Sequence, residues 1–139
     1  MPQFLFDTDH LTLYERGHSL LVPRVAVLPP DTVGVSAVTV EEALRGRLGY
    51  LARPLSSAAR VRGYTLLVGT VRLFHQLPIL PFDQASETQF QHLRAQPLRV
   101  GTQDLRIAAV ALVNHLTLLT RNRRDSSRIV GLSIDDWSL

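Results

Sequence analysis

Short apolar segments alternate along this chain with longer segments of helical spacing, and this alternation limits the fold more than any other feature. Strands that are separated by helices need crossover connections, which place the strands parallel in one sheet. The pattern therefore predicts an α/β fold, a three-layer α/β/α sandwich with a mostly parallel central sheet. A length of 139 residues suits a single domain over residues 1–139.

The element boundaries are predicted from apolar runs, caps and helix breakers. Strands are expected at residues 3–6, 33–38, 79–82 and 117–120, with a last strand inside 129–134. Helices are expected over residues 18–27, 40–51, 56–75 and 102–114, and two others follow the caps Thr8 or Asp9 and Asp83. Thr39 is expected to cap the helix over 40–51, where its spacing to Glu42 matches a capping box.

Four acidic residues stand where predicted strands end or predicted helices begin. Asp7 follows the first strand, Glu42 lies just past the second, Asp104 opens the helix over 102–114, and Asp125 follows the fourth strand. Ligands of open α/β sheets bind beyond the carboxyl ends of the strands, so these four carboxylates are expected to meet there. A cluster of like charges needs a neutralising cation, and oxygen ligands suit Mg²⁺ or Mn²⁺.

The composition excludes several kinds of site. The chain has no cysteine, which removes disulfides, zinc–thiolate sites and a cysteine nucleophile, and which fits the cytoplasm. All fifteen cationic residues are arginine, so a Walker-type phosphate loop and Schiff-base chemistry are excluded. The arginines are consistent with codon bias and also with phosphate contact. No apolar run is long enough to cross a membrane, and the start lacks the charge of a signal peptide.

Four motifs in this order resemble those of PIN-domain proteins, specifically VapC-type ribonuclease toxins. The motifs are FDTD at residues 6–9, SAVTVEE at 36–42, GTQDLRIAA at 101–109 and TRNRRD at 120–125, and the similarity extends to the terminal Asp136 and Trp137. The resemblance implies the compact α/β/α sandwich and Mg²⁺- or Mn²⁺-dependent cleavage of RNA. It also implies neutralisation by a small cognate antitoxin and a toxin homodimer.

The resemblance also assigns the site, position by position. Glu42 matches the family's second acid better than Glu41, because the family places that acid three residues after the threonine. Asp9 stands where asparagine is commoner and adds another potential ligand, and Ser126 stands where phenylalanine is usual. The implied catalytic and metal-binding residues are Asp7, Glu42, Asp104 and Asp125.

In our hypothesis Asp7 and Asp104 are the primary metal ligands, and Glu42 and Asp125 bind directly or through water. Thr120 and Asn122 would hold Asp125 in place. Each acid also has a plainer explanation. Asp7 would be a turn residue and Asp104 an acid favoured by the helix dipole, while Glu42 would complete a capping box and Asp125 would lie in a solvated loop.

Two other functions stay open at this point. The run Asp7-Thr8-Asp9 resembles the nucleophile motif of haloacid-dehalogenase-like phosphatases, with Asp7 attacking phosphate, but Leu11 stands where a small residue is expected and no lysine is present. A non-catalytic PIN module that binds RNA or protein is the third hypothesis.

Several other residue groups are candidates for binding. Arginines beside Asp125 are expected either to meet RNA phosphates or to be solvated, namely Arg121, Arg123, Arg124 and Arg128. All five histidines are expected to be ordinary surface or packing residues, and Trp137 is expected to pack the C-terminal strand. A set of leucines is expected either to form an antitoxin groove or to be core, with at least half in the core; these are Leu44, Leu48, Leu51, Leu66 and Leu67.

Overall fold

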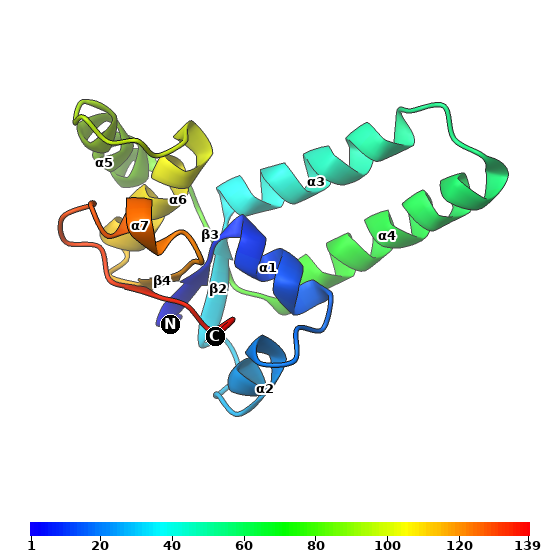
Figure 1. Ribbon diagram of the computed structural model, residues 1–139, viewed down its shortest axis with the longest axis horizontal. Helices are drawn as coiled ribbons and strands as arrows, with labels where there is room; N and C mark the ends of the chain where they lie inside the picture. The colour runs from blue at the N-terminus through cyan, green and yellow to red at the C-terminus, as the bar shows by residue number, and fades with distance from the viewer.

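A wholly parallel five-stranded sheet in the order β3-β2-β1-β4-β5 forms the centre of the computed structural model, which describes residues 1–139. The strands are β1 (Phe4–Phe6), β2 (Val33–Ser36), β3 (Ile79–Leu80), β4 (Thr117–Leu119) and β5 (Ile134–Asp135). The helices are α1 (Thr8–Glu15), α2 (Leu21–Ala26), α3 (Ala37–Leu51), α4 (Ser57–Gln76), α5 (Gln84–Arg94), α6 (Thr102–Val113) and α7 (Arg123–Ser126). The predicted α/β/α sandwich is confirmed (Figure 1).

Neighbouring residues on the central strands pack into different layers. Leu5 of β1 and Leu118 of β4 lie in one buried cluster with residues of α6, whereas Phe6 and Leu119 lie in another with residues of α1, α2 and α4. Successive side chains of a strand point to opposite faces, so each central strand contributes to both cores. α5 packs outside α6 through a third cluster around Phe90.

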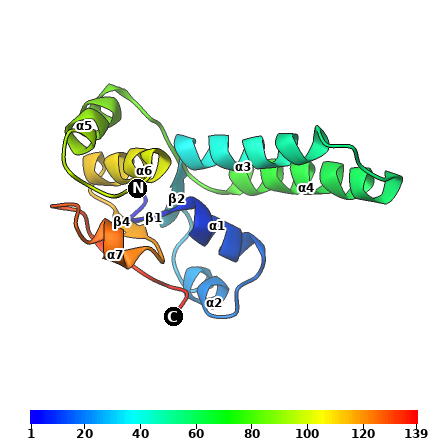
Figure 2. The same ribbon diagram turned by 45° about the horizontal axis from the view of Figure 1, so that its top comes forward.

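The helices α3 and α4 lie side by side and project away from the sheet (Figures 1 and 2). Gly63 lies where they approach closely: a Cβ there would stand 2.7 Å from Cδ2 of Leu51 and 3.1 Å from the ring of Tyr50. None of the five leucines from the proposed groove is buried, and Leu48 is 57% exposed. The expectation that at least half of them form the core is wrong, because the sheet does not reach under the projecting part of the helix pair.

Three local predictions also need correction. α3 begins at Ala37, and its cap is Ser36, whose Oγ accepts a hydrogen bond from the Thr39 N–H at 3.2 Å; Thr39 is therefore inside the helix. The cap of α1 is Asp7, whereas Thr8 or Asp9 was expected. The last strand begins at Ile134, so it barely overlaps the predicted range.

The remaining predicted elements agree with the structure to within a few residues, and Asp83 caps α5 as expected. The short helix α7 was not predicted. No helix combines the length and the apolar character that spanning a membrane requires.

Candidate active site

Asp7 lies at the carboxyl edge of the sheet, between the end of β1 and the start of α1. Its N–H donates to the carbonyl oxygen of Leu119 at 3.0 Å, which keeps the chain beside β4 as β1 ends. Its Oδ1 accepts the N–H of His10 at 2.6 Å and so caps α1. No hydrogen bond engages Oδ2, which leaves this oxygen for another partner.

Asp104 reaches the same edge from the first turn of α6. Asp7 and Asp104 line one small cavity of about 20 Å³, together with Thr120, Asn122 and Ser126 among others. This volume has room for about one water-sized particle. Side chains from opposite parts of the sequence therefore meet at the point where the parallel strands end.

Both burial and neighbouring negative charges act on the pKa of Asp104. Burial of the carboxyl raises this pKa above its ordinary value, and the charges of Asp7, Glu42 and Asp9 raise it further, in that order. Crowded carboxylates of this kind are relieved when a cation binds among them.

Glu42 extends from α3 toward this cluster, and a hydroxyl group holds it there. Thr8 Oγ1 donates to Glu42 Oε1 at 2.7 Å and lies 3.1 Å from Thr39 Oγ1. The capping-box explanation is wrong, because Ser36 caps α3 and the Glu42 carboxylate is bound to a different helix.

The neighbouring Glu41 lies on the outside of the helix. Its carboxylate accepts hydrogen bonds from Gln103 at 3.1 Å and from Arg45 at 2.6 Å. The hydrogen bond from Gln103 and the charge of Arg45 hold the pKa of Glu41 below its ordinary value. Of the two adjacent glutamates, only Glu42 is among the charges that raise the pKa of Asp104.

Asp9 is bound by an arginine instead of being a free ligand. Arg121 donates from Nε and Nη2 to the two oxygens of Asp9, at 2.6 and 2.8 Å. These hydrogen bonds and the charge of Asp9 raise the pKa of Arg121. The pair places a guanidinium beside the acidic cluster, where a phosphate group would approach.

Asp125 is less well connected than the other three predicted acids. It lies on α7 and is not among the charges that shift the pKa of Asp104. Neither Thr120 nor Asn122 hydrogen-bonds its carboxylate; instead, Thr120 Oγ1 accepts the N–H of Asn122 at 3.0 Å. The role of Asp125 stays a prediction.

Comparison with known proteins supports one family. No family model matches the chain. The chain is 27% identical over 142 residues to the tRNA(fMet)-specific endonuclease VapC of Shigella flexneri, covering 99% of this chain and all of that protein. It is 26% identical to Ribonuclease VapC1 of Haemophilus influenzae (strain R2866), over 97% of this chain and 98% of that protein. A solved structure of DNA-bound VapBC from Salmonella typhimurium superposes with a TM-score of 0.78 and 25% identity, over 99% of both chains.

The chain is similar over its whole length to VapC ribonucleases, in sequence and in fold. The resemblance inferred from the four motifs is thereby confirmed. The match runs the full length of these relatives, so it includes the projecting α3–α4 pair as well as the sheet.

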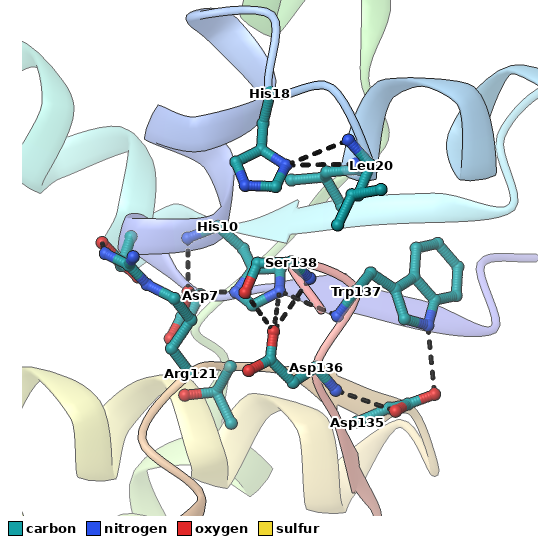
Figure 3. A network of polar contacts seen from close by, with 12 residues as sticks. Asp7, His10, His18, Leu20, Arg121, Asp135, Asp136, Trp137 and Ser138 are labelled. Carbon is teal, nitrogen blue, oxygen red and sulfur yellow. Dashed lines mark hydrogen bonds and ion pairs between the residues drawn. The ribbon is translucent and has the colours of Figure 1, made fainter.

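In this VapC-like chain the sequence did not reveal the role of His10. The residue is completely buried, and its ring lies between Asp7 and the C-terminal segment (Figure 3). Its Nε2 accepts the N–H of Trp137 at 3.3 Å, and its Nδ1 lies 3.5 Å from Asp7 Oδ1 without a hydrogen bond. The only signal in the sequence was its position, three residues after the acid that caps the helix.

The oxygen atoms of the site fit a hard divalent cation. Asp7, Asp9 and His10 also lie within 4.8 Å of one another through one atom each. That alternative set is less suitable, because Arg121 donates to both Asp9 oxygens and His10 Nε2 already accepts the N–H of Trp137. Carboxylates from three elements form the better set, namely Asp7, Glu42 and Asp104.

Proposed function

We propose that this VapC-like chain is a metal-dependent endoribonuclease and the toxin of a type II toxin–antitoxin pair. Its metal would be Mg²⁺ or Mn²⁺, held by Asp7, Asp104 and Glu42, with Asp125 as a further catalytic and metal-binding residue. The observation that carries the proposal is that Asp7 and Asp104, from distant parts of the chain, line one cavity at the sheet edge. Burial and the nearby charges of Asp7, Glu42 and Asp9 raise the pKa of Asp104 there. The two relatives described above are named as an endonuclease and a ribonuclease.

The chain's own groups suit hydrolysis of a phosphodiester. A bound divalent cation would supply Lewis acidity and would promote deprotonation of water at neutral pH. Asp7 Oδ1 is fixed by α1, so its Oδ2 is the oxygen available for binding. Thr8 holds Glu42 Oε1, and Glu42 Oε2 is left to orient the attacking water and to accept its proton. The water oxygen forms the new bond to phosphorus as the bond to the leaving ribose oxygen breaks.

An adjoining groove suits an RNA strand. It has a volume of about 500 Å³ between α1, α3 and α4, and both Thr8 and Glu42 contribute to its lining. Arg16 and Arg62 line the groove without an ion pair, whereas Arg47 is paired with Glu15 at 2.6 Å. Unpaired arginines beside the catalytic acids favour phosphate contact, with affinity that falls as salt rises.

The phosphatase alternative loses support from the same geometry. It needs Asp9 as a free acid–base group next to the nucleophile Asp7, but both Asp9 oxygens are held by Arg121. The non-catalytic alternative differs only in activity, so a cleavage assay decides it.

Replacing Glu42 with glutamine is expected to lower RNA cleavage by roughly 100-fold, because a group that takes the proton from water is lost. The matched control is Glu41→Gln, which removes a charge at the next residue, where the carboxylate makes an exposed ion pair with Arg45 and accepts a hydrogen bond from Gln103. Purified variants are incubated with total RNA and Mn²⁺, Mg²⁺ or EDTA, and the new RNA ends are mapped. Wild-type protein that leaves RNA intact with either metal would support the non-catalytic module, and equal rates for both variants would reject the role of Glu42.

The antitoxin would bind the projecting helices. Exposed apolar side chains recur along one side of α4 at helical spacing: Val61, Tyr64, Val68 and Val71. Exposed apolar stripes of this kind bind amphipathic helices. Several similar solved structures are of VapBC complexes. We therefore propose a small cognate antitoxin as the partner of this face, and a homodimer and a cytoplasmic location as further expectations from the resemblance.

Val68→Asp is expected to weaken binding of the co-expressed antitoxin by about 10-fold or more, since it places a charge in an apolar contact. Val130→Asp is the control, because Val130 is 88% exposed and lies outside the helix pair. Binding is measured by calorimetry on the purified partners, and light scattering gives the oligomeric state of the toxin. Equal affinity of the two variants would place the antitoxin elsewhere.

A further inference from the structure

His10 links the C-terminal segment to the carboxylate of Asp7. Its ring is fully buried although it belongs to the first turn of a surface helix. On one side Nε2 accepts the backbone N–H of Trp137, and on the other Nδ1 lies 3.5 Å from Asp7 Oδ1 (Figure 3). The contact with Trp137 is between residues 127 positions apart, so it depends on the complete fold.

The hydrogen bond from Trp137 determines where the proton of His10 lies. Because Nε2 uses its lone pair to accept an N–H, the proton of the neutral ring is on Nδ1, and a charged ring carries a proton there as well. Nδ1 is therefore a donor that faces Asp7, and it has no other hydrogen-bond partner. An unpaired buried N–H is unfavourable unless it acquires an acceptor.

The C-terminal segment that holds the ring is itself fixed. Asp136 Oδ1 accepts the N–H of Ser138 at 2.9 Å and its hydroxyl at 2.5 Å, so this oxygen is occupied although it lies 3.5 Å from His10 Nε2. Trp137 is buried, with its ring centroid 4.7 Å from that of Phe4. These contacts hold the imidazole in one orientation.

We propose that His10 is a positioning residue, which donates from Nδ1 to Asp7 Oδ1 when a divalent cation binds and so directs Oδ2 toward the cation. The proposal rests on the metal-dependent function proposed above. A histidine beside a ligating carboxylate fixes the orientation of that ligand, and loss of such a partner typically lowers metal affinity by about 10- to 100-fold. His10 does not touch the metal or the RNA.

The test is Mn²⁺ affinity, measured without RNA by the loss of the free-ion electron paramagnetic resonance signal. His10→Leu keeps an apolar side chain but no donor, and is expected to bind Mn²⁺ at least about 10-fold more weakly. His10→Asn places an amide donor near the position of Nδ1 and is expected to restore binding. His18→Leu is the control, because the His18 side chain accepts hydrogen bonds only from the N–H groups of Leu20 and Leu21 at the start of α2. Cleavage by His10→Leu should recover at saturating Mn²⁺, which a purely structural defect would not do.

Each result has a defined meaning. Wild-type affinity in folded His10→Leu overturns the positioning role, while loss of binding in Asp7→Asn still supports the metal site. If His10→Leu does not fold, the comparison of His10→Asn with His10→Gln decides, because glutamine extends its amide toward Trp137; equal affinities overturn the proposal. Wild-type protein that does not bind Mn²⁺ at all overturns the metal site and the positioning role together.

Discussion

Asp7→Asn is expected to abolish RNA cleavage and to leave the protein folded. The substitution removes one negative charge and one anionic oxygen from the cluster that would hold the cation. Loss of several kcal/mol of transition-state stabilisation corresponds to roughly a thousandfold lower rate. The asparagine oxygen can still accept the N–H of His10, so α1 keeps its cap and the fold should change little.

Asp83→Asn gives a closely matched control. Asp83 also caps a helix through its carboxylate, accepting the N–H of Ser86 at 2.9 Å, but it lies before α5 and outside the acidic cluster. Both variants should show similar circular dichroism, and only Asp7→Asn should lose cleavage of a fluorogenic RNA at saturating Mn²⁺. Wild-type rates in folded Asp7→Asn would remove Asp7 from the catalytic residues.

The meeting of Asp7 and Asp104 could be predicted because it depends on topology alone. Each residue stands next to a clear element boundary, and parallel strands bring all such boundaries to one edge. The structure agrees with this inference: β1 and β4 are parallel neighbours that pair from Phe4 to Phe6, so both strands end at the same edge of the sheet. Long-range geometry did not need to be known in detail.

The start of α3 shows where local patterns are insufficient. Ser36 and Thr39 are both good helix caps, and the sequence alone favours neither. Pairing of β2 with β3 decides between them, because Ser36 is paired with Leu80 and the helix begins immediately afterwards. With Ser36 as the cap, Glu42 no longer stands at the capping-box position, and its carboxylate accepts a hydrogen bond from Thr8 of α1.

Other errors have the same origin in contacts between distant segments. Helical periodicity identifies an apolar face but not what covers it, so the leucines of α3 and α4 were expected in a core that does not extend to them. The position of His10 becomes informative only when the C-terminus returns to place Trp137 beside it. The arginines of the groove likewise come from the end of α1, from α3 and from α4, and no short sequence motif contains all of them.

Asp104→Asn is expected to raise the stability of the metal-free protein while it abolishes cleavage. Burial and the neighbouring acids raise the folded-state pKa of Asp104 above its ordinary value of 3.8. A carboxyl group with a raised folded-state pKa contributes stability below its unfolded-state pKa, and this contribution is lost as the pH rises through the folded-state value. Near neutral pH the ionised group therefore destabilises the fold, and asparagine removes this penalty.

The measurement is the melting temperature of both proteins in EDTA from pH 4 to pH 8. The advantage of Asp104→Asn should grow as the pH rises and level off above the folded-state pKa of Asp104. Asp83→Asn should behave in the opposite sense. Hydrogen bonds from Ser86 lower the pKa of Asp83, so the native carboxylate stabilises the fold at neutral pH and loses this effect on acidification. The variant should therefore melt below wild type at neutral pH, and the difference should shrink as the pH falls. Added Mn²⁺ should stabilise wild type more than Asp104→Asn, because only wild type retains the full set of acids that binds it. Identical melting curves for wild type and Asp104→Asn at pH 8 without metal would mean that these carboxylates do not repel one another, and the electrostatic basis for a cation at this edge of the sheet would fail.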